Sequence, residues 1–285
     1  MLRGRWLIDK AWAEAHLPLV LSLLKGNPVS FVERTGNELI ERPFAIDPKT
    51  MQRYEWRDGT NPNIPEGSIG ILPINGPITK YNGDCGEPGA IAKNSWLMQM
   101  GKRANIGSVI MLVDTPGGEA RAASTFTRTI QNFSKPILSY IDGMSASLGV
   151  WLISPTDEIY VSSKMDEVGS VGSFVMLADW AGYFEAQGLK IHEIYAPQST
   201  DKNKDYRDAI KGDYGEVEKD LEVLVNDFIS FVKSTRPKTT ATEKQWSTGK
   251  MFYADEAQKL GLIDGIKTFD QVVSKASWLG KRYKK

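Results

Sequence analysis

The chain has 285 residues, enough for one large domain or two small ones with a substantial core. Hydrophobic residues make up 41% and charged residues 25%, values typical of soluble globular proteins that exclude wholesale disorder and a multi-span membrane protein. Lys plus Arg and Asp plus Glu number 35 each, so the formal charge is zero and no global attraction to nucleic acid or anionic lipid is expected.

The N-terminal region and the cysteine content bear on the compartment. The single cysteine, Cys85, excludes an intramolecular disulfide and favours a reducing compartment. The apolar run at residues 17–24 is far shorter than the roughly 20 residues of a membrane span. Asp9 and Glu14 precede it, unlike the pattern of a signal peptide. We therefore expect an amphipathic helix here, no stable membrane span and a cytoplasmic protein.

Pro, Gly and Asn divide the chain into three parts. Residues 1–65 are predicted to form an N-terminal appendage and linker, which ends in the turn-rich segment DGTNPNIPEG. Residues 66–268 alternate short apolar strands with helical segments, which predicts α/β layers. Residues 269–285 are predicted to form a C-terminal helix and a basic tail.

The central part gives the clearest predicted elements. In chain order, we expect strands at 69–74, 108–114, 136–142, 158–162 and 190–196. Helices are expected at 88–104, 118–133, 178–188 and 214–233. In the last helix, apolar residues recur at three- and four-residue steps, which indicates one buried face. Two short helices and a turn are expected over 241–266.

The segment VDTPGGEA, residues 113–120, takes the chain from a buried strand into a predicted helix. Gly117 and Gly118 permit a tight turn with bare backbone amides, and such amides at a helix start are suited to an anionic oxygen. The segment is therefore half of a possible oxyanion hole. An ordinary strand-to-helix turn explains the same residues.

The segment YIDGMSASLGVWLIS, residues 140–154, contains Ser145 and Ser147 where a strand leads into an apolar helix. The hydroxyl of Ser147 would lie near unpaired helix amides, and the amide of Leu148 would face the same oxygen. Alternatively, Ser145 caps the helix and Ser147 packs against a neighbour.

A nucleophilic serine requires a base, and the chain offers few histidines. His16 lies in the appendage, and His192 lies within a predicted strand, where a structural role is expected. A lysine whose pKa is lowered by burial can replace histidine. Lys202 and Lys204 follow that strand in a polar loop, although charged loops are most often solvated surface. Ser170, in the segment GSVG, would either orient a neutral lysine amine or cap a turn.

These segments occur in a recognisable order: D-x-P-G-G after a strand, then S-A-S-x-G-x-W-x-I-S, then G-S-x-G, then a lysine-bearing loop. The combination resembles the signal peptide peptidase A and phage prohead protease family. The resemblance extends over residues 67–266, about two thirds of the chain, and includes the closing segment GKMFYADEAQKLGLIDGI. It implies a Ser-Lys peptidase on a crotonase-like (Clp protease-like) α/β fold of stacked strand-strand-helix units, with an N-terminal appendage and C-terminal helices.

The resemblance also implies a role for each site residue. Ser147 matches the nucleophile, and Ser170 matches the serine that holds the lysine. Gly117 and Gly118 match one oxyanion donor region, and Leu148 occupies the position of the other donor, where the family usually has glycine. The lysine loop departs from the family's commonest form, so Lys202 and Lys204 compete, and we prefer Lys202 from the register.

The expected reaction is peptide hydrolysis through an acyl-enzyme, with lysine as general base and acid and without metal or organic cofactor. An extended polypeptide would pair with a strand edge beside Ser147. The family's habit of ring assembly implies a homo-oligomer. The expected absence of an anchor favours capsid maturation in a phage or prophage, or general peptide turnover.

Three other functions compete with this hypothesis. A Clp-type Ser-His-Asp peptidase needs a histidine shortly after the serine, and residues 165–180 contain none. A crotonase-type acyl-CoA enzyme would use Asp114 or Asp142 as an acid or base, without a nucleotide-binding signature in its favour. A catalytically silent scaffold or assembly module would retain the fold alone.

Overall fold

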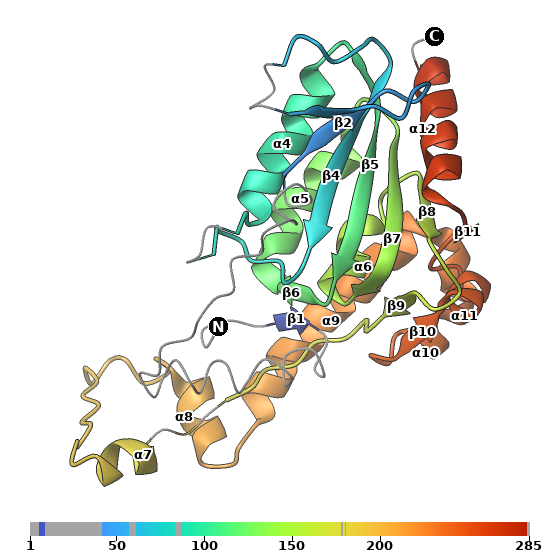
Figure 1. Cartoon of the computed structure of the whole chain (residues 1–285). Helices are drawn as coiled ribbons and strands as arrows, with labels where there is room; N and C mark the ends of the chain where they lie inside the picture. The colour runs from blue at the N-terminus through green and yellow to red at the C-terminus, as the bar shows by residue number, and fades with distance from the viewer. Residues whose placement is uncertain are drawn as a thin grey trace.

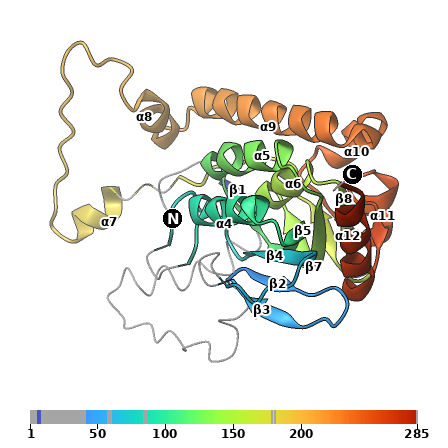
Figure 2. The ribbon, with the colours of Figure 1, turned by 90° about the horizontal axis from the view of Figure 1, so that it is seen from above.

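The computed structural model describes residues 6–8, 42–56, 61–83, 87–177, 179 and 181–283. The helix predicted at 17–24 lies outside these ranges, as do His16 and Cys85. Figures 1 and 2 show a twisted sheet with helices on both faces, and a long segment between β9 and α9 that projects away from it. No helix within the described ranges is both long enough and apolar enough to cross a membrane.

Parallel strands form the centre of the molecule. The described residues give a nine-stranded sheet with the order β10-β9-β7-β5-β4-β2-β3, while β8 pairs with β7 and β11 pairs with β8. The central strands are parallel and confirm four of the predicted strands: β4 (Ser68–Asn75), β5 (Ile106–Thr115), β7 (Ile137–Ala146) and β8 (Glu158–Val161). Their near-continuous apolar sequences suit strands that are buried on both faces.

Helices cover the two faces unequally. The larger core lies against α4 (Ala90–Lys102), α5 (Ala123–Gln131), α6 (Leu148–Ile153) and α9 (Gly215–Thr235). A smaller core on the opposite face packs against α12 (Phe269–Tyr283). The side-chain period of two sends Leu72 and Ile74 of β4 into the first core and Ile69 and Ile71 into the second. This layering confirms the α/β class and fits the predicted crotonase-like architecture.

Two short strands extend the sheet on the N-terminal side. β2 (Phe44–Ile46) pairs antiparallel with β4, and β3 (Arg53–Glu55) pairs with β2. These residues fall within the predicted appendage, which ends at residue 65. Three-residue strands are too short to produce a recognisable alternation of apolar and polar residues, so the sequence did not reveal that they belong to the sheet.

Several short elements complete the fold, and one of them corrects a prediction. The helix expected at 118–133 begins only at Ala123, because the glycine-rich turn forms the strand β6 (Gly117–Glu119) and a turn of 3₁₀ helix (Ala120–Ala122). The remaining elements are β1 (Trp6–Ile8), β9 (Glu167–Gly169), α7 (Ala181–Ala186), α8 (Lys204–Ile210), η3 (Pro237–Thr242), α10 (Glu243–Trp246), β10 (Met251–Tyr253), α11 (Ala254–Lys259) and β11 (Gly265–Ile266).

Residues 174–214, which we call the arm, leave the body of the molecule and return to it at α9 (Figure 1). The strand predicted at 190–196 is wrong, since these residues form no strand in the structure. The pattern of alternation is present, but Ile191 is 63% exposed and Ile194 is 92% exposed. A strand requires a partner for its backbone, and none is present in the described part of the chain. His192 is therefore exposed and not part of a core.

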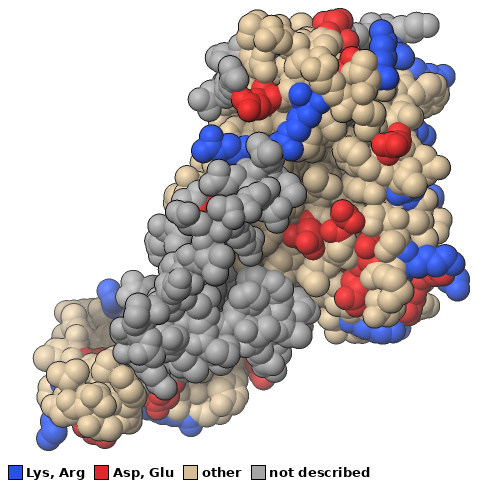
Figure 3. Space-filling view, in the orientation of Figure 1, with Lys and Arg blue, Asp and Glu red and all other residues tan. Residues whose placement is uncertain are grey.

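The visible surface carries both signs of charge. In Figure 3, Lys and Arg side chains are interspersed with Asp and Glu side chains over the body, without one large area of a single sign. This distribution agrees with the zero formal charge of the sequence.

Candidate active site

Ser147 is the single residue between the end of β7 and the start of α6, and its backbone conformation is unusual. Its dihedral angles are φ 51° and ψ −114°, a conformation that a residue with a side chain rarely adopts. The Ser147 N–H donates to the Gly169 carbonyl at 2.8 Å, and its carbonyl accepts from the Trp151 N–H at 3.2 Å. Strained positions of this kind cluster at functional sites.

The hydroxyl of Ser147 is buried and makes only a weak hydrogen bond. The residue is 1% exposed, and Oγ makes one long hydrogen bond of 3.5 Å to the Gly172 carbonyl. Within the described ranges, no basic side chain hydrogen-bonds to this oxygen. Ser147 does not cap α6 through its side chain. The alternative of a simple capping or packing serine is therefore weaker, since neither role requires the strained backbone.

The neighbouring Ser145 does not act as the helix cap. It lies on β7, is fully buried, and its hydroxyl has no hydrogen-bond partner among the described residues. A Cβ built on Gly149, in the first turn of α6, would lie 2.9 Å from this oxygen. Ser145 is thus packed beneath the helix that begins after Ser147.

An irregularity in β7 determines where Ser147 lies. Val113 pairs with Ile141, but Thr115, two residues further along β5, pairs with Ser145, four residues further along β7. β7 therefore contains two extra residues at this point, as in a β-bulge. Bulges of this kind redirect the strand that follows, which here leads to Ser147.

Gly117 and Gly118 form β6 beside the start of α6. The Gly117 N–H donates to Thr115 Oγ1 at 3.1 Å, while that hydroxyl donates to the Gly76 carbonyl at 2.6 Å. Gly117 has φ 103°, and a Cβ on Gly118 would lie only 1.9 Å from the carbonyl oxygen of Ile78. Glycine is thus required at both positions, and the Gly118 amide, which the Thr115 hydroxyl does not engage, is the candidate oxyanion donor.

Leu148 supplies the other predicted donor position. It is the first residue of α6, and amides in the first turn of a helix have no carbonyl partner within the helix. Its side chain is completely buried in the larger core. The side chain that replaces the usual glycine therefore points into the core and leaves the amide in place.

Ser170 lies next to Ser147 through strand pairing. Ala146 of β7 pairs in parallel with Gly169 of β9. Ser147 and Ser170 are the next residues after this pair, one on each chain segment. Ser170 also has positive φ, at 54°, and its N–H donates to the Lys250 carbonyl at 2.8 Å. The structure thus brings Ser147 and Ser170 together, with β6 alongside α6.

The two candidate lysines lie on the arm, and neither contacts Ser147. Lys204 is the first residue of α8, and its Nζ donates to Asp208 at 2.6 Å. That hydrogen bond and the charge of Asp208 raise the pKa of Lys204. Lys202 is exposed in the preceding turn, where its backbone N–H donates to the Ser199 carbonyl at 3.3 Å.

Carboxylates gather at the β7 bulge. Asp114 accepts from the Met144 N–H at 3.2 Å, and Asp142 accepts from the Ser162 hydroxyl at 2.9 Å. Asp166 accepts from the Gly143 N–H at 3.3 Å. Burial raises the pKa of Asp114, and the charges of Asp142 and Asp166 raise it further. The acids considered for an acyl-CoA enzyme thus support the shape of the bulge. Within the described ranges, no three side chains form a site that would hold a metal ion.

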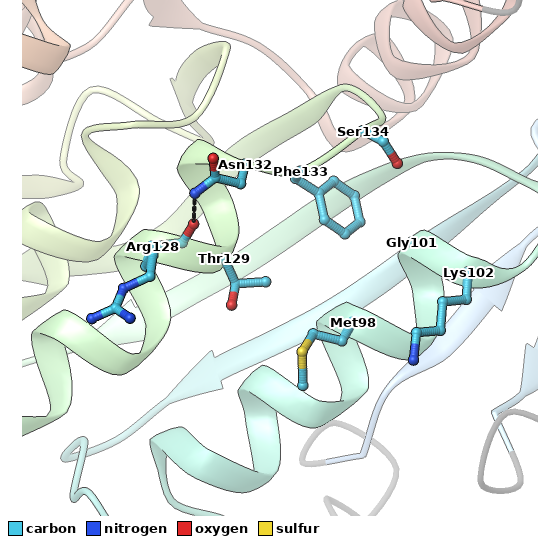
Figure 4. A pocket seen from close by; sticks show the side chains of 8 residues that line it. All are labelled: Met98, Gly101, Lys102, Arg128, Thr129, Asn132, Phe133 and Ser134. Carbon is cyan, nitrogen blue, oxygen red and sulfur yellow. Dashed lines mark hydrogen bonds between the residues drawn. The ribbon is translucent and has the colours of Figure 1, made fainter.

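A surface pocket of about 420 Å³ lies elsewhere, between the ends of α4 and α5 (Figure 4). Met98 and Lys102 line it from α4, and Arg128 and Phe133 line it from α5 and the turn that follows. None of the predicted site residues lines this pocket.

Comparison with known proteins gives a family match and several relatives. The model described as "Peptidase family S49" matches residues 130–281. A protein of Methanocaldococcus jannaschii named as a protease is 26% identical over 180 residues, which cover 62% of this chain and 58% of the relative. Protease 4 of Salmonella typhi and Protease 4 of Haemophilus influenzae are each 23% identical, covering 75% and 76% of this chain and 35% of each relative. The chain thus spans less than two thirds of the length of these relatives.

Solved structures with a similar arrangement include a membrane-bound stomatin-specific protease in complex with a substrate peptide. It has a TM-score of 0.44 and 19% sequence identity, and the alignment covers 72% of this chain and 78% of that one. An enoyl-CoA hydratase/isomerase family protein from Silicibacter pomeroyi has a TM-score of 0.47 and 13% identity, with coverage of 75% and 79%. The family match covers more than half of the chain and confirms the resemblance predicted from the motifs: the chain belongs to peptidase family S49.

Proposed function

We propose that this protein hydrolyses peptide bonds with Ser147 as the nucleophile. The observation that carries the proposal is the strained, buried Ser147 at the start of α6, with Gly118 on the neighbouring β6 and Ser170 directly after the adjacent strand β9. Membership in a peptidase family gives the class of reaction. Family relatives named as proteases support the same assignment.

The proposed reaction proceeds through an acyl-enzyme. A neutral lysine amine takes the proton of the Ser147 hydroxyl as Oγ attacks the peptide carbonyl carbon. The amides of Gly118 and Leu148 stabilise the resulting oxyanion. The protonated lysine then gives its proton to the leaving amine, and the C–N bond breaks. Water, activated by the same lysine, hydrolyses the ester and restores Ser147.

Lys202 is the base that we propose, with Ser170 orienting its amine. A general base must be uncharged near neutral pH, and Asp208 favours the charged form of Lys204 by raising its pKa. Within the described ranges, the Lys202 amine forms no comparable ion pair, and Lys202 precedes Lys204 on the same arm. This favours Lys202, in agreement with the preference from the sequence.

We further propose that the arm engages a second copy of the chain in a ring-shaped homo-oligomer. The arm carries apolar side chains that the described part of the same chain leaves exposed: Met176, Leu177, Tyr183, Leu189, Ile191 and Ile194. An extended segment with unpaired backbone and exposed apolar residues is suited to pairing with another chain. Assembly would move the arm, and with it Lys202, toward a Ser147 site.

The proposed substrate is an extended polypeptide whose backbone pairs with a strand edge beside Ser147. We propose two sources of such a substrate: capsid proteins of a phage or prophage, and cytoplasmic peptides in general turnover. Both present the same backbone to the site.

Substitution of Ser147 tests the function. Ser147→Ala should abolish cleavage of an unstructured protein such as casein and prevent labelling by a fluorophosphonate, while the oligomeric state stays that of the wild type. Ser145→Ala is the matched control, since it lies two residues away on β7 and should retain labelling. Unchanged cleavage by Ser147→Ala would refute the assignment, and an unlabelled, inactive wild type that still assembles would favour the scaffold alternative.

The same assay distinguishes the lysines. Lys202→Ala should reduce kcat by at least about 10²-fold, the lower end of the usual contribution of a general base. Lys204→Ala should retain most of the activity. The reverse result would transfer the role of base to Lys204.

A further inference from the structure

The N-terminal strand β1 lies on β6, the strand that carries Gly118. Trp6 pairs with Glu119, Leu7 with Gly118 and Ile8 with Gly117, all antiparallel. β1 and β6 form a two-stranded sheet of their own, and Figure 1 shows them side by side. Ile8 is buried, with 8% of its surface exposed. A segment far from the site in sequence therefore lies at its edge.

The hydrogen bonds of β6 show which groups face β1. The Glu119 N–H donates to the Ile78 carbonyl at 2.8 Å, and the Ile78 N–H donates to the Gly117 carbonyl at 2.8 Å. Successive residues of a strand direct their N–H and C=O groups to opposite edges. The N–H and C=O of Gly118 therefore point away from Ile78, toward Leu7.

We propose that Trp6–Ile8 is an internal substrate mimic that occupies the peptide-binding edge of β6 and competes there with substrate. This inference rests on the proposed function, in which the Gly118 amide holds the oxygen of the scissile carbonyl. In the structure, the backbone of Leu7 lies opposite that amide. The occupant is thus an extended, antiparallel segment of the chain itself.

Occupation by β1 has a quantitative consequence. Only molecules in which β1 has left β6 can bind a peptide at this edge, so the apparent affinity falls in proportion to that fraction. Release of β1 should therefore lower the KM for a peptide substrate and leave kcat nearly unchanged.

Two variants at one position test the competition. Leu7→Pro removes the N–H that faces Gly118 and disrupts the pairing, whereas Leu7→Ala retains the backbone and serves as the matched control. Each is made in the full chain that also carries Ser147→Ala, which prevents cleavage of the probe. The probe is a fluorescently labelled peptide with the sequence of residues 3–10, RGRWLIDK, and its binding is followed by anisotropy.

We expect the Leu7→Pro protein to bind the probe at least tenfold more tightly than the Leu7→Ala protein or the parent. Equal binding by all three proteins would overturn the mimic. The binding assay does not depend on catalysis, so it separates the two proposals. Tighter binding by Leu7→Pro with no cleavage by any protein with Ser147 intact would contradict the peptidase function alone. Cleavage with identical KM in the presence and absence of Leu7→Pro would contradict the mimic alone.

A disulfide provides a second test that does not require a disrupted strand. Trp6 and Glu119 are paired and do not exchange hydrogen bonds, a geometry whose Cα separation suits a disulfide. With Cys85→Ser, the variant Trp6→Cys/Glu119→Cys should close under oxidation and lose at least tenfold in cleavage, and reductant should restore it. The control Trp6→Cys/Arg121→Cys should not close. Full cleavage with the disulfide closed would overturn the inference.

Discussion

The backbone of Ser147 stores strain, and two elements, β9 and α6, hold it in place. A residue with a side chain at φ 51° costs about 1–3 kcal/mol relative to an ordinary conformation. β9 holds the Ser147 N–H through Gly169, and α6 holds the carbonyl through Trp151. The fold therefore fixes the backbone that carries this hydroxyl, which suits the nucleophile that we propose.

Gly118 provides a prediction at the residue scale. In Gly118→Ala, the new Cβ would lie 1.9 Å from the Ile78 carbonyl oxygen, so β6 must shift and its amide must leave the oxyanion position. We expect cleavage to fall by about 10²–10³-fold, as for loss of one oxyanion donor, when folded protein is assayed. The control Gly182→Ala, where no atom lies within 4 Å, should retain activity. Normal activity in Gly118→Ala would exclude this donor.

Asp114 gives a prediction about pH. Because burial raises its pKa in the folded state, the folded protein is favoured most when the carboxyl is protonated, below its ordinary pKa near 4. This contribution is lost as the pH rises through the folded-state pKa. Asp114→Asn should therefore increase the free energy of unfolding at pH 8, by about 0.5 kcal/mol or less at this partly exposed site, and change it little at pH 3.5. Urea denaturation at both pH values measures this, and a less stable variant at pH 8 would contradict it.

At this scale the motifs predicted residues that the fold brings close together, because those residues belong to the rigid core. Gly117, Gly118, Ser147 and Ser170 all lie at the ends of packed strands, so their order along the chain determines their neighbours. The lysine was not determined in this way. Lys202 lies in a segment with little packing of its own, and local sequence does not fix where such a segment lies.

At the scale of elements, β7 pairs with β5 along one edge and has two partners in succession along the other. Its first half pairs with β8, and after the bulge its last residues pair with β9. The sequence predicted the strand at 136–142 but not its continuation to Ala146, because glycine and polar residues interrupt the apolar run. The continuation is the part that carries the chain to Ser147.

A stacked aromatic pair joins α6 to α9 and gives a prediction for the elements. The rings of Trp151 and Phe228 are 4.6 Å apart between centroids, with 13° between their planes, and Phe228 is completely buried. Phe228→Ala should decrease the free energy of unfolding by about 3–5 kcal/mol, the usual cost of such a cavity. Val223→Ala, 64% exposed on the same helix, should change it by about 0.5 kcal/mol or less. Urea denaturation measures both, and similar values would contradict the packing role.

The periodicity of apolar residues predicted the type of an element correctly where that element packs against the core. The helix predicted at 214–233 is α9, Gly215–Thr235, and its apolar face packs at Phe228 and Val232. The strand predicted at 190–196 failed for the opposite reason, since its alternation faces solvent on both sides. Alternation of apolar and polar residues therefore does not by itself show that a segment is paired within its own chain.

At the scale of the whole molecule, the arm predicts a change in assembly. Ile191→Glu/Ile194→Glu should convert the oligomer to smaller species by light scattering, because charge replaces the exposed apolar contact. Thermal stability of the isolated fold should be unchanged, since neither side chain packs in it. The control Met165→Glu, 71% exposed on the body, should assemble normally. Identical masses for the two variants, or a monomeric wild type, would contradict the proposed role of the arm.

Both ends of the arm lie at the same helix, α9. Ser173, the residue before the arm, donates its hydroxyl to the Leu221 carbonyl of α9 at 3.0 Å, and the arm ends at the start of α9. The arm therefore leaves the body and rejoins it beside the same helix, α9. A change in the length of the arm away from Lys202 would therefore leave the strands under Ser147 in place, so the contacts proposed for the arm and the packed core that holds Ser147 can be altered separately.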